Sequence, residues 1–458
     1  MRDEPAVDLV VAGAGGGLVA ALRAAEQGLS VLVVEADEHF RRGNNTYMST
    51  GMIPAAGTRW QREAGVEDSA QGFVADVMAK TGGQAEPALT AALADCAPVL
   101  VEWLADHVGL PIELATDFLY PGHSAHRCHT VPGRSGTGLL DPLTRKAAAA
   151  DRIDMLVPAS LTDVSTDGTG SVRAAVVEFP DGTREEIPCR AVLLATNGFG
   201  ADRELVRELL PAIADAVYHG GERSAGDALR IGTGLGAAVG YLDAYQGHAG
   251  LSSGGSLLTW ASVMHGAVLV NTGGRRFGDE TTGYSEYAEA VVAQPGGTAW
   301  LVYDQRIHEA CLPFQDYLDV VEGGGVRRAD TVPGLAELTG LPVGELTRTL
   351  GEAARAAGGE GHDPFGRTLW EAPLEAPYSA VRVRGALFHT QGGLMVDGHG
   401  RVLREDGTPI PGLYASGGAA IGISGHGAGG YLAGNGLLPA FGLAYLAADH
   451  LRTVTERT

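Results

Sequence analysis

The sequence contains few cysteines and none of the spacings that bind metals. Its 458 residues include four cysteines that lie far apart and form no C-x-x-C pair: Cys96, Cys128, Cys189 and Cys311. This pattern is not typical of a zinc site, an iron–sulfur site or a disulfide framework. We therefore expect reduced thiols, as in a cytosolic protein, and no bound metal.

Long apolar runs and an excess of positive charge are also missing. No uninterrupted apolar stretch approaches the roughly 18 residues of a membrane-spanning helix, and no signal peptide precedes the first apolar run at Val7. The net charge of −22 argues against binding to nucleic acid or to an anionic membrane. We expect a cytoplasmic protein with no membrane insertion and no nucleic-acid partner, whose oligomeric state the sequence leaves open.

Residues 7–36 carry the most informative pattern that is present. An apolar strand is expected at 7–12, a glycine-rich turn at 13–17, a helix at 18–27 and a second strand at 30–34, which leads directly into an acid. A short strand, a glycine turn, a helix, a strand and an acid within about 30 residues favour dinucleotide binding over a purely structural turn.

Each part of this pattern has a physical role. Gly13 allows the tight turn, and Gly15 has no side chain, so a pyrophosphate can approach the backbone. The helix N-terminus then offers free N–H groups and a positive dipole end. Glu35 can accept hydrogen bonds from a ribose diol. Leu18 stands where a third glycine is expected, so either the helix and strand lie further apart or the neighbouring glycines compensate.

The remaining chain alternates between helical and β-rich patterns. Helical spacing is expected at 68–108 and 139–150, and separate strands at 184–188 and 191–196, on either side of a short break. The segment 245–373 has more aromatic residues and irregular loops and contains a helical pair at 332–358. We therefore expect one nucleotide-binding domain from residues 1–244 and 374–458, interrupted by a separate domain at 245–373.

Nine short motifs give the chain a family resemblance that covers nearly its whole length. In chain order they are GNNTYMSTGM, HR, LLATNGF, SAGDALR, QGH, LVNTGGRRFGDE, HTQGGL, PGLYASG and AGNG. Together they resemble soluble flavoproteins of the fumarate reductase and succinate dehydrogenase superfamily, which also contains 3-ketosteroid Δ1-dehydrogenases. The resemblance implies an α/β fold, with a Rossmann-like FAD-binding domain of the glutathione-reductase type and an inserted α+β capping domain.

The resemblance also implies which residues hold FAD. They are Gly13, Gly15, Gly16, Glu35, Asn44, Asn45, Thr50, Gly51, Met52, Thr196, Asn197, Gly198, Asp227, Gly417, Asn435 and Leu437. The histidine that carries covalent flavin in the membrane-complex members is absent from residues 43–52. Non-covalent FAD is therefore expected. The pair His126-Arg127 is expected either to anchor its loop on the flavin side or to touch substrate.

The arginines that bind dicarboxylates in fumarate reductases are missing from the matching positions. The two family histidines are kept as His248 and His389. The family's proton-donor arginine corresponds to Tyr284, and its carboxylate-binding arginine to Tyr431. The glutamate and arginine of the cap segment are replaced as well, by Trp260 and Val263. Because an arginine fork pairs both oxygens of a carboxylate, a site without these cations would bind a dicarboxylate poorly.

Tyrosines in these positions are similar to those of the ketosteroid dehydrogenases. Tyr284, Tyr431 and Tyr120 lie at comparable places, and the resemblance implies that Tyr431 polarises a ketone oxygen and Tyr284 removes the α-proton. FAD N5 would take the β-hydrogen as hydride. Asn435 stands where that family has a glycine, whose backbone N–H helps to bind the ketone oxygen. Enolate stabilisation of this kind makes hydride removal from a saturated carbon feasible.

The sequence therefore favours an FAD-dependent oxidoreductase acting on a CH–CH bond beside a carbonyl, with dehydrogenation of a cyclic ketone as the preferred direction. Its partners would be a small-molecule carbonyl substrate and an external electron acceptor or donor. The alternatives are a reductase of fumarate or another enoate, and a non-catalytic flavoprotein subunit. If residues 382–384 form a strand, Arg382 and Arg384 share a face, and Arg384 could hold a single substrate carboxylate.

Overall fold

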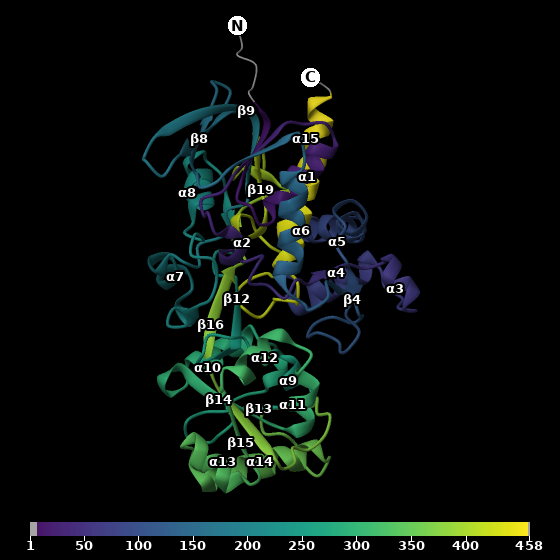
Figure 1. The fold of residues 1–458 in the computed structure, drawn as a ribbon, viewed down its shortest axis with the longest axis vertical. Helices are drawn as coiled ribbons and strands as arrows, with labels where there is room; N and C mark the ends of the chain where they lie inside the picture. Colours follow the sequence, from purple (N-terminus) through teal and green to yellow (C-terminus); the bar gives the residue numbers. More distant parts are fainter. Residues whose placement is uncertain (1–6, 457–458) are drawn as a thin grey trace. The chain divides into compact units, whose positions relative to one another are not determined.

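The computed structural model describes residues 7–456, which form two compact units (Figure 1). The first unit contains residues up to 210, 220–245 and from 389 onward, and the second contains 211–219 and 246–388. The insertion expected at 245–373 lies almost entirely in the second unit. That unit extends to Phe388 because the long strand β16 (Tyr378–Thr390) pairs with two strands of the insertion.

The first unit is organised around a mostly parallel sheet of the order β18-β19-β9-β1-β2-β6. The strands are β1 (Val7–Ala12), β2 (Val31–Val34), β6 (Ile153–Leu156), β9 (Arg184–Leu194), β18 (Arg401–Leu403) and β19 (Pro409–Ala415). β1 runs parallel to both β2 and β9. The apolar run of β1 is buried because helices and a second layer cover the sheet, as the sequence pattern indicates.

The two strands expected at 184–188 and 191–196 are one continuous strand, so this expectation was wrong. The first half of β9 pairs antiparallel with β8 (Val172–Glu178), which in turn pairs with β7 (Ser160–Thr166). The second half enters the central sheet between β1 and β19. The side chains of β9 are mostly exposed in its first half and buried in its second. The residue pattern therefore changes from polar to apolar within the strand, and this change suggested two strands.

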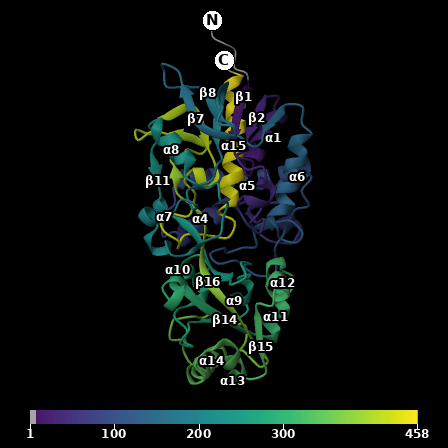
Figure 2. The same cartoon turned by 60° about the vertical axis from the view of Figure 1, so that its left-hand side comes forward.

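Five helices of ten or more residues lie in the described part of the first unit, and the first, fourth and fifth of them pack against strands of its main sheet. They are α1 (Gly17–Glu26), α4 (Ala70–Lys80), α5 (Pro87–Trp103), α6 (Gly136–Ala148) and α15 (Leu437–Thr455). α15 packs against both α1 and α5, and the two views show it running beside them (Figure 1 and Figure 2). A π-helical turn, Leu104–Val108, extends α5. The N-terminus of α15 therefore reaches the carboxyl ends of the parallel strands.

One helix passes a length and composition test for crossing a membrane, although polar residues interrupt its run in the sequence. Among the described residues it is the segment Pro87–Val108, and 56% of its most apolar window is buried in the first unit. The core helix of a soluble protein meets the same criteria.

Short elements complete the first unit. They are α2 (Phe40–Gly43), β3 (Ile53–Pro54), α3 (Arg59–Glu63), β4 (Glu113–Leu114), β5 (Cys128–Thr130), α7 (Arg203–Leu209), α8 (Asp227–Gly234), β11 (Val239–Gly240) and β17 (Gly393–Leu394). β3, β5 and β4 form a small antiparallel sheet, and β11 pairs with β17.

The second unit has its own core around a mixed sheet in which β16 is central. Its strands are β10 (Val217–Tyr218), β12 (Tyr245–Ser252), β13 (Val268–Val270), β14 (Thr298–Asp304), β15 (Val326–Ala329) and β16. Its helices are α9 (Ala261–Met264), α10 (Glu286–Val292), α11 (Gln305–Cys311), α12 (Gln315–Glu322), α13 (Val332–Thr339) and α14 (Val343–Ala357). The last two confirm the expected helical pair.

Gly13 provides a test of how tightly the first turn is packed. It has φ +105°, and a Cβ there would lie 2.4 Å from the carbonyl oxygen of Ala195. We expect Gly13→Ala to lower the free energy of unfolding by about 3 kcal/mol, from backbone strain and overpacking combined. Gly28→Ala is the matched control, because Gly28 has φ +88° but no described atom within 4 Å of an added Cβ.

The Gly28→Ala control should lower the free energy of unfolding by only about 1 kcal/mol, since backbone strain is its one cost. Urea unfolding of the two variants under the same conditions measures the difference. Equal losses in the two variants would contradict the close packing of Gly13.

Candidate active site

The glycine turn between β1 and α1 packs directly against two other chain segments. An added Cβ on Gly16 would lie 2.8 Å from the carbonyl oxygen of Ala440 in α15, and one on Gly15 would lie 2.9 Å from Thr46 Oγ1. A Cβ on Gly17 would lie 2.5 Å from Val11. Gly17 therefore provides the close contact between helix and strand that the missing third glycine would give, one residue before Leu18.

Glu35 ties the end of β2 to this turn. Its carboxylate accepts hydrogen bonds from the backbone N–H groups of Ala14 (2.7 Å) and Asp37 (2.8 Å). The side chain is buried, and the resulting loss of hydration raises the pKa of its carboxyl group, which these backbone bonds partly offset. Each carboxylate oxygen keeps a lone pair that could accept a further hydrogen bond. A contact between Glu35 and a ribose is therefore possible in this arrangement and stays a prediction.

The loop at residues 43–52 lies beside the glycine turn. Asn44 Oδ1 accepts from the N–H of Tyr47 (2.9 Å), and Asn45 Oδ1 accepts from the N–H of Gly221. The carbonyl oxygen of Thr50 accepts a hydrogen bond from Thr130 Oγ1 (3.2 Å). Gly51 has φ +66°, and Met52 is buried in a small cluster with Cys128 and Ala433. The structure therefore brings this predicted loop to the predicted turn.

The carboxyl ends of β9 and β19 bring a second turn to the same edge of the sheet. Asn197 has φ +66°, and its Nδ2 donates to Ser224 Oγ (2.9 Å). A Cβ on Gly198 would overlap Thr390 Oγ1, and a Cβ on Gly417 would lie 3.2 Å from Ala440 Cβ. Thr196, Asn197, Gly198 and Gly417 thus lie together.

Two other residues that were predicted to contact FAD have different surroundings. Asp227 pairs with Arg230 at the start of α8 (3.4 Å), and Leu437 is packed in the core.

Four buried polar atoms in these segments have no hydrogen-bond partner within residues 7–456. They are Asn44 Nδ2, Thr196 Oγ1, Ser416 Oγ and Asn435 Oδ1. A buried polar group without a partner costs about 1–3 kcal/mol, so such groups indicate a ligand that satisfies them. Together with the glycine cradle, they fit FAD, whose pyrophosphate and ring system both carry many hydrogen-bonding atoms.

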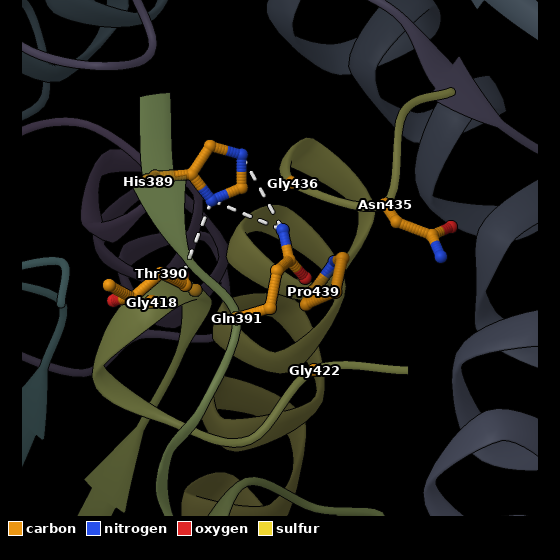
Figure 3. A pocket seen from close by; sticks show the side chains of 9 residues that line it. His389, Thr390, Gln391, Gly418, Gly422, Asn435, Gly436 and Pro439 are labelled. Carbon is orange, nitrogen blue, oxygen red and sulfur yellow. Dashed lines mark hydrogen bonds between the residues drawn. The ribbon is translucent and has the colours of Figure 1, made fainter. Parts of the chain in front are cut away.

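A small cavity lies at the end of β16 and the start of α15, in the first unit (Figure 3). It is lined by His389, Thr390, Gln391, Gly417, Gly418, Gly422, Asn435, Gly436 and Pro439. Burial lowers the pKa of His389 to about 4, so its ring is neutral at pH 7. None of these nine residues is therefore charged at neutral pH.

Tyr431 and His389 meet at the first turn of α15. Their ring centroids lie 6.0 Å apart in an edge-to-face arrangement. An added Cβ on Gly436 would lie 2.8 Å from His389 Nε2 and 3.6 Å from the Tyr431 hydroxyl oxygen. Gly436 therefore leaves the space into which a ring nitrogen and a phenol both project. The structure brings these two predicted residues together.

Tyr120 lies in the same unit, beside the 43–52 loop. It packs against Met52, Cys128 and Ala433, and its hydroxyl is 3.5 Å from Arg134 Nη1. Loss of hydration raises the pKa of this phenol, so Tyr120 is poorly suited to act as a base. A catalytic role for Tyr120 stays a prediction, and its present contacts are those of a packing residue.

The loop that contains Tyr120 is anchored by a buried ion-pair network. The guanidinium of Arg127 is fully buried between Asp68 and Asp76, to both of which it donates. Arg127 therefore anchors its loop to the chain, and a position of this loop beside the flavin stays a prediction. His126 Nδ1 is buried and has no partner among the described residues.

His248 and Tyr284 form an aromatic cluster in the second unit. The ring of His248 stacks on Tyr284 (4.9 Å between centroids) and on Phe388 (5.5 Å), and meets Trp260 edge-on at 5.7 Å. His248 Nδ1 accepts from the N–H of Gly250 (3.0 Å), which places the ring proton on Nε2. Burial lowers the pKa of His248 to about 3. This histidine is also neutral.

A buried charge network supports the segment that leads to Tyr284. Glu280 is fully buried and accepts hydrogen bonds from Arg276, Arg367 and the backbone N–H of Leu269. Arg367 also donates to the carbonyl oxygens of Val263 and Ala267. The guanidinium groups of both arginines are therefore already bound to carboxylate and carbonyl oxygens within the second unit. Arg367 could not be recognised from the sequence, because no motif marks a residue 87 positions from its carboxylate partner.

Arg382 and Arg384 lie on β16 and share one face of the strand, as the alternation predicts. That face is exposed, and in the antiparallel register they stand opposite Trp300 and Thr298 of β14. The charged groups are therefore in water. This setting lends no support to a substrate carboxylate held by Arg384.

The sequence model described as "FAD binding domain" matches residues 8–437, nearly the whole chain. The chain belongs to the FAD-binding domain family. The glycine turn, the buried polar atoms without partners and the family match together support FAD as its cofactor. The relatives described next show that it is an FAD-dependent oxidoreductase of the kind that acts on a CH–CH bond.

Two relatives of this flavoprotein carry names that refer to different compounds. A probable fumarate reductase of Shewanella frigidimarina is 29% identical over 451 residues, which cover 96% of this chain and 74% of the relative. A 4-oxocyclohexanecarboxylate 2-dehydrogenase of Sinomonas cyclohexanicum is 28% identical, over 96% of this chain and 92% of the relative. The first name refers to an unsaturated dicarboxylate and the second to a cyclic ketone.

Among the solved structures that are similar to this chain, one is also a fumarate reductase and another a ketosteroid dehydrogenase. The open conformation of a flavocytochrome c3 fumarate reductase superposes with a TM-score of 0.81 at 28% identity, covering 98% of this chain and 79% of that one. A 3-ketosteroid Δ4-(5α)-dehydrogenase from Rhodococcus jostii RHA1, solved with 4-androstene-3,17-dione, gives 0.75 at 25% identity, covering 97% and 96%. The expected α/β FAD-binding fold is thereby confirmed, and it carries additional capping sheets.

The neutral state of His248 makes this flavoprotein less stable in acid. The folded state holds the ring unprotonated down to about pH 3, whereas the unfolded chain takes up the proton near pH 6.5. Stability from this group is therefore present above pH 6.5 and is lost as the pH falls, because the unfolded state binds more protons. Between pH 7 and pH 5 the loss is about 2 kcal/mol.

The His248→Asn variant isolates this contribution. Urea unfolding at pH 7 and pH 5 should show that the difference in unfolding free energy between wild type and variant narrows by about 2 kcal/mol at pH 5. A difference that is the same at both pH values would mean that His248 is not held neutral by burial.

Proposed function

We propose that this flavoprotein oxidises a CH–CH bond beside the carbonyl of a small cyclic ketone. It would use non-covalently bound FAD in the cytoplasm and pass electrons to an external acceptor. One observation carries the proposal: Tyr431 and His389 present two uncharged polar groups at the first turn of α15, beside a cavity whose lining residues are all neutral.

Neutral hydrogen-bond donors suit a carbonyl better than a dicarboxylate. A dicarboxylate brings two full negative charges, and burying them without a cation is costly. A ketone is neutral at rest and gains negative charge on oxygen only as its α-proton leaves. Donors that lie ready in a buried site stabilise this developing charge. We assign this donor role to Tyr431 and His389.

The α-proton needs an acceptor, and we assign this role to Tyr284. Its backbone is tied to β12 through the bond from the Ala249 N–H to the Tyr284 carbonyl (3.1 Å), and its ring is stacked on neutral His248. A phenol accepts a proton from carbon only when its pKa is lowered or a relay carries the proton onward. FAD, when bound, supplies the acceptor for the two electrons and the second hydrogen.

A second candidate is the reduction of an enoate, fed by an external electron donor. It is favoured by the similarity to a fumarate reductase over 96% of this chain and by the two histidines that match that family. The same donors would serve reduction, because microscopic reversibility requires the same groups in both directions. A non-catalytic flavoprotein subunit is disfavoured, since the histidines and tyrosines predicted for the substrate site are present in the sequence.

Flavin colour distinguishes these candidates directly. Under anaerobic conditions, cyclohexanone, 4-oxocyclohexanecarboxylate or a saturated 3-ketosteroid should bleach the oxidised flavin of the purified holoprotein, whereas succinate should not. In the reverse experiment, dithionite-reduced protein is mixed with fumarate or with a cyclic enone. Rapid re-oxidation by fumarate, with no response to any ketone or enone, would establish the enoate reductase instead.

Removal of the phenol at Tyr431 tests the carbonyl donor. We expect Tyr431→Phe to lower ketone turnover by about 10²–10³, the usual cost of one donor to a developing oxyanion. The control is Tyr414→Phe, which removes a hydroxyl bonded to His450 at 2.9 Å in β19. Turnover of Tyr431→Phe within a few-fold of this control would exclude Tyr431 as the donor.

Removal of the phenol at Tyr284 tests the proton acceptor. Tyr284→Phe should retain FAD and its visible spectrum but lose turnover by about 10²–10⁴, because a positioned base is worth this much. The α-deuterated ketone should show a primary isotope effect in the wild type. If the variant turns over at the wild-type rate, another group removes the proton.

A further inference from the structure

The segment 425–436, which carries Tyr431, is built from turns and contains neither helix nor strand. Glycines make up half of it, and three of them have positive φ: Gly425 (+63°), Gly427 (+64°) and Gly434 (+87°). Glycine allows many backbone conformations, so a segment of this kind does not fix its own shape. The position of Tyr431 therefore depends on contacts between this segment and other parts of the first unit.

One such contact is a hydrogen bond between the His123 side chain and the backbone of Ala433. Nε2 of the imidazole lies 3.2 Å from the Ala433 carbonyl oxygen, across 310 positions of the sequence. Both residues are buried, so water does not compete for the bond. Ala433 lies two residues from Tyr431 and two from Asn435. A shift of its carbonyl group therefore moves the backbone that carries both side chains.

The two ring nitrogens of His123 have different partners. Arg127 Nη1 lies 3.4 Å from Nδ1, and a guanidinium group can only donate. A carbonyl oxygen can only accept, so Nε2 must carry the proton that is given to Ala433. The opposite tautomer would place an N–H against the guanidinium and a lone pair against the carbonyl oxygen. The Cys128 thiol, 3.9 Å from both Nε2 and that oxygen, is only a weak hydrogen-bonding group.

The group that selects this tautomer is itself held in place. Arg127 donates to Asp68 and Asp76, and its guanidinium carbon lies 5.1 Å from the centroid of the Phe73 ring. The His123 ring stacks on the same Phe73, with 6.2 Å between centroids. Burial lowers the pKa of His123 to about 4, and the charge of Arg127 acts in the same direction. At pH 7 the ring is therefore neutral and has a single N–H to donate.

We propose that His123 is a positioning residue whose Nε2–H holds the Ala433 carbonyl and, through it, the Tyr431 hydroxyl. The inference rests on the proposed function, in which Tyr431 donates a hydrogen bond to the ketone oxygen of the substrate. His123 acts through the backbone of the glycine-rich segment and does not contact the substrate. Arg127 acts one step further back, because it selects the tautomer that can donate. Without this donor, the segment 425–436 relaxes and the Tyr431 hydroxyl leaves the position that serves the reaction.

Both steps can be observed in the holoprotein without substrate. In protein labelled with ¹⁵N-histidine, His123 should show a protonated Nε2 and an unprotonated Nδ1 at pH 7, and His123→Gln identifies the signal by its loss. With tyrosine labelled with ¹³C at Cζ, Tyr431→Phe identifies the Tyr431 signal, which should shift in His123→Leu. A His123 ring protonated on Nδ1, or a Tyr431 signal that is unchanged in His123→Leu, would overturn the proposal.

Two variants separate the donor from the bulk of the ring. His123→Leu keeps an apolar side chain in the buried space but has no N–H for Ala433. His123→Gln carries an amide nitrogen that can reach about the position of the histidine Nε2 and can donate in its place. The glutamine variant should therefore return the Tyr431 signal to its wild-type position. A Tyr431 signal that is shifted equally in both variants would mean that the hydrogen bond does not position this residue.

His129→Leu is the matched control in the same unit. His129 is also buried and neutral, with its pKa lowered to about 4 by burial. Its ring nitrogens bond to Thr58 Oγ1 (2.8 Å) and to the Arg127 carbonyl oxygen (2.9 Å), which lie outside the segment 425–436. This variant should lose stability in urea unfolding but leave the Tyr431 signal unchanged.

The kinetic result should follow the position of the phenol. We expect kcat for the ketone to fall about 10²-fold in His123→Leu while KM changes little, because a misplaced donor fails to stabilise charge that develops during the reaction. His123→Gln should recover most of this loss, and His129→Leu should retain the wild-type kcat. Equal losses of kcat in the two leucine variants would show a general loosening of the unit and would overturn the positioning role.

If His123→Leu does not fold, His123→Asn gives the same test. Its shorter amide does not reach the Ala433 carbonyl, so it should show the shifted Tyr431 signal and the lowered kcat, and wild-type values of both would contradict the proposal. If no ketone is a substrate, the proposed function fails. The histidine and tyrosine signals then still decide whether His123 positions Tyr431.

Discussion

Close contact between backbone atoms at the carboxyl ends of β1, β9 and β19 is the constraint on which the cofactor site depends. Gly13 lies against the Ala195 carbonyl, and Gly16 lies against the Ala440 carbonyl in α15. A side chain in either place would push these segments apart and close the space for a pyrophosphate. The same contacts bring the N-terminus of α15 to the sheet edge. The helix dipole, Tyr431 and Asn435 therefore all depend on them.

Burial determines the charge state of the groups around the proposed chemistry. His389 and His248 are neutral because the surrounding protein excludes water, and the charges that are buried nearby in each unit are paired. In the second unit, Glu280 is held by Arg276 and Arg367. A site built in this way stabilises charge that appears during a reaction better than charge that a substrate brings with it.

Much of the first unit could be predicted from local sequence because its signals are short and contiguous. The turn, the first helix and the strands on either side follow from residues 7–36. The missing third glycine was an open question that packing answered, since Gly17 makes the close contact with Val11. The long strand β9 was divided in error, because exposed and buried halves of one strand show different residue patterns.

The sequence by itself indicated that this protein binds a dinucleotide, because the turn that approaches a pyrophosphate consists of neighbouring residues whose backbone needs are local. FAD in particular followed from the resemblance of its motifs to a flavoprotein family. The family resemblance also predicted tyrosines at places where fumarate reductases are expected to carry arginines. Only the tertiary structure decided which polar groups meet. The bond from His123 to Ala433, and the contact of Arg367 with Glu280, join residues that are distant in sequence. Hydrogen bonds of this kind depend on distances within a few tenths of an ångström, which packing sets and no local pattern encodes.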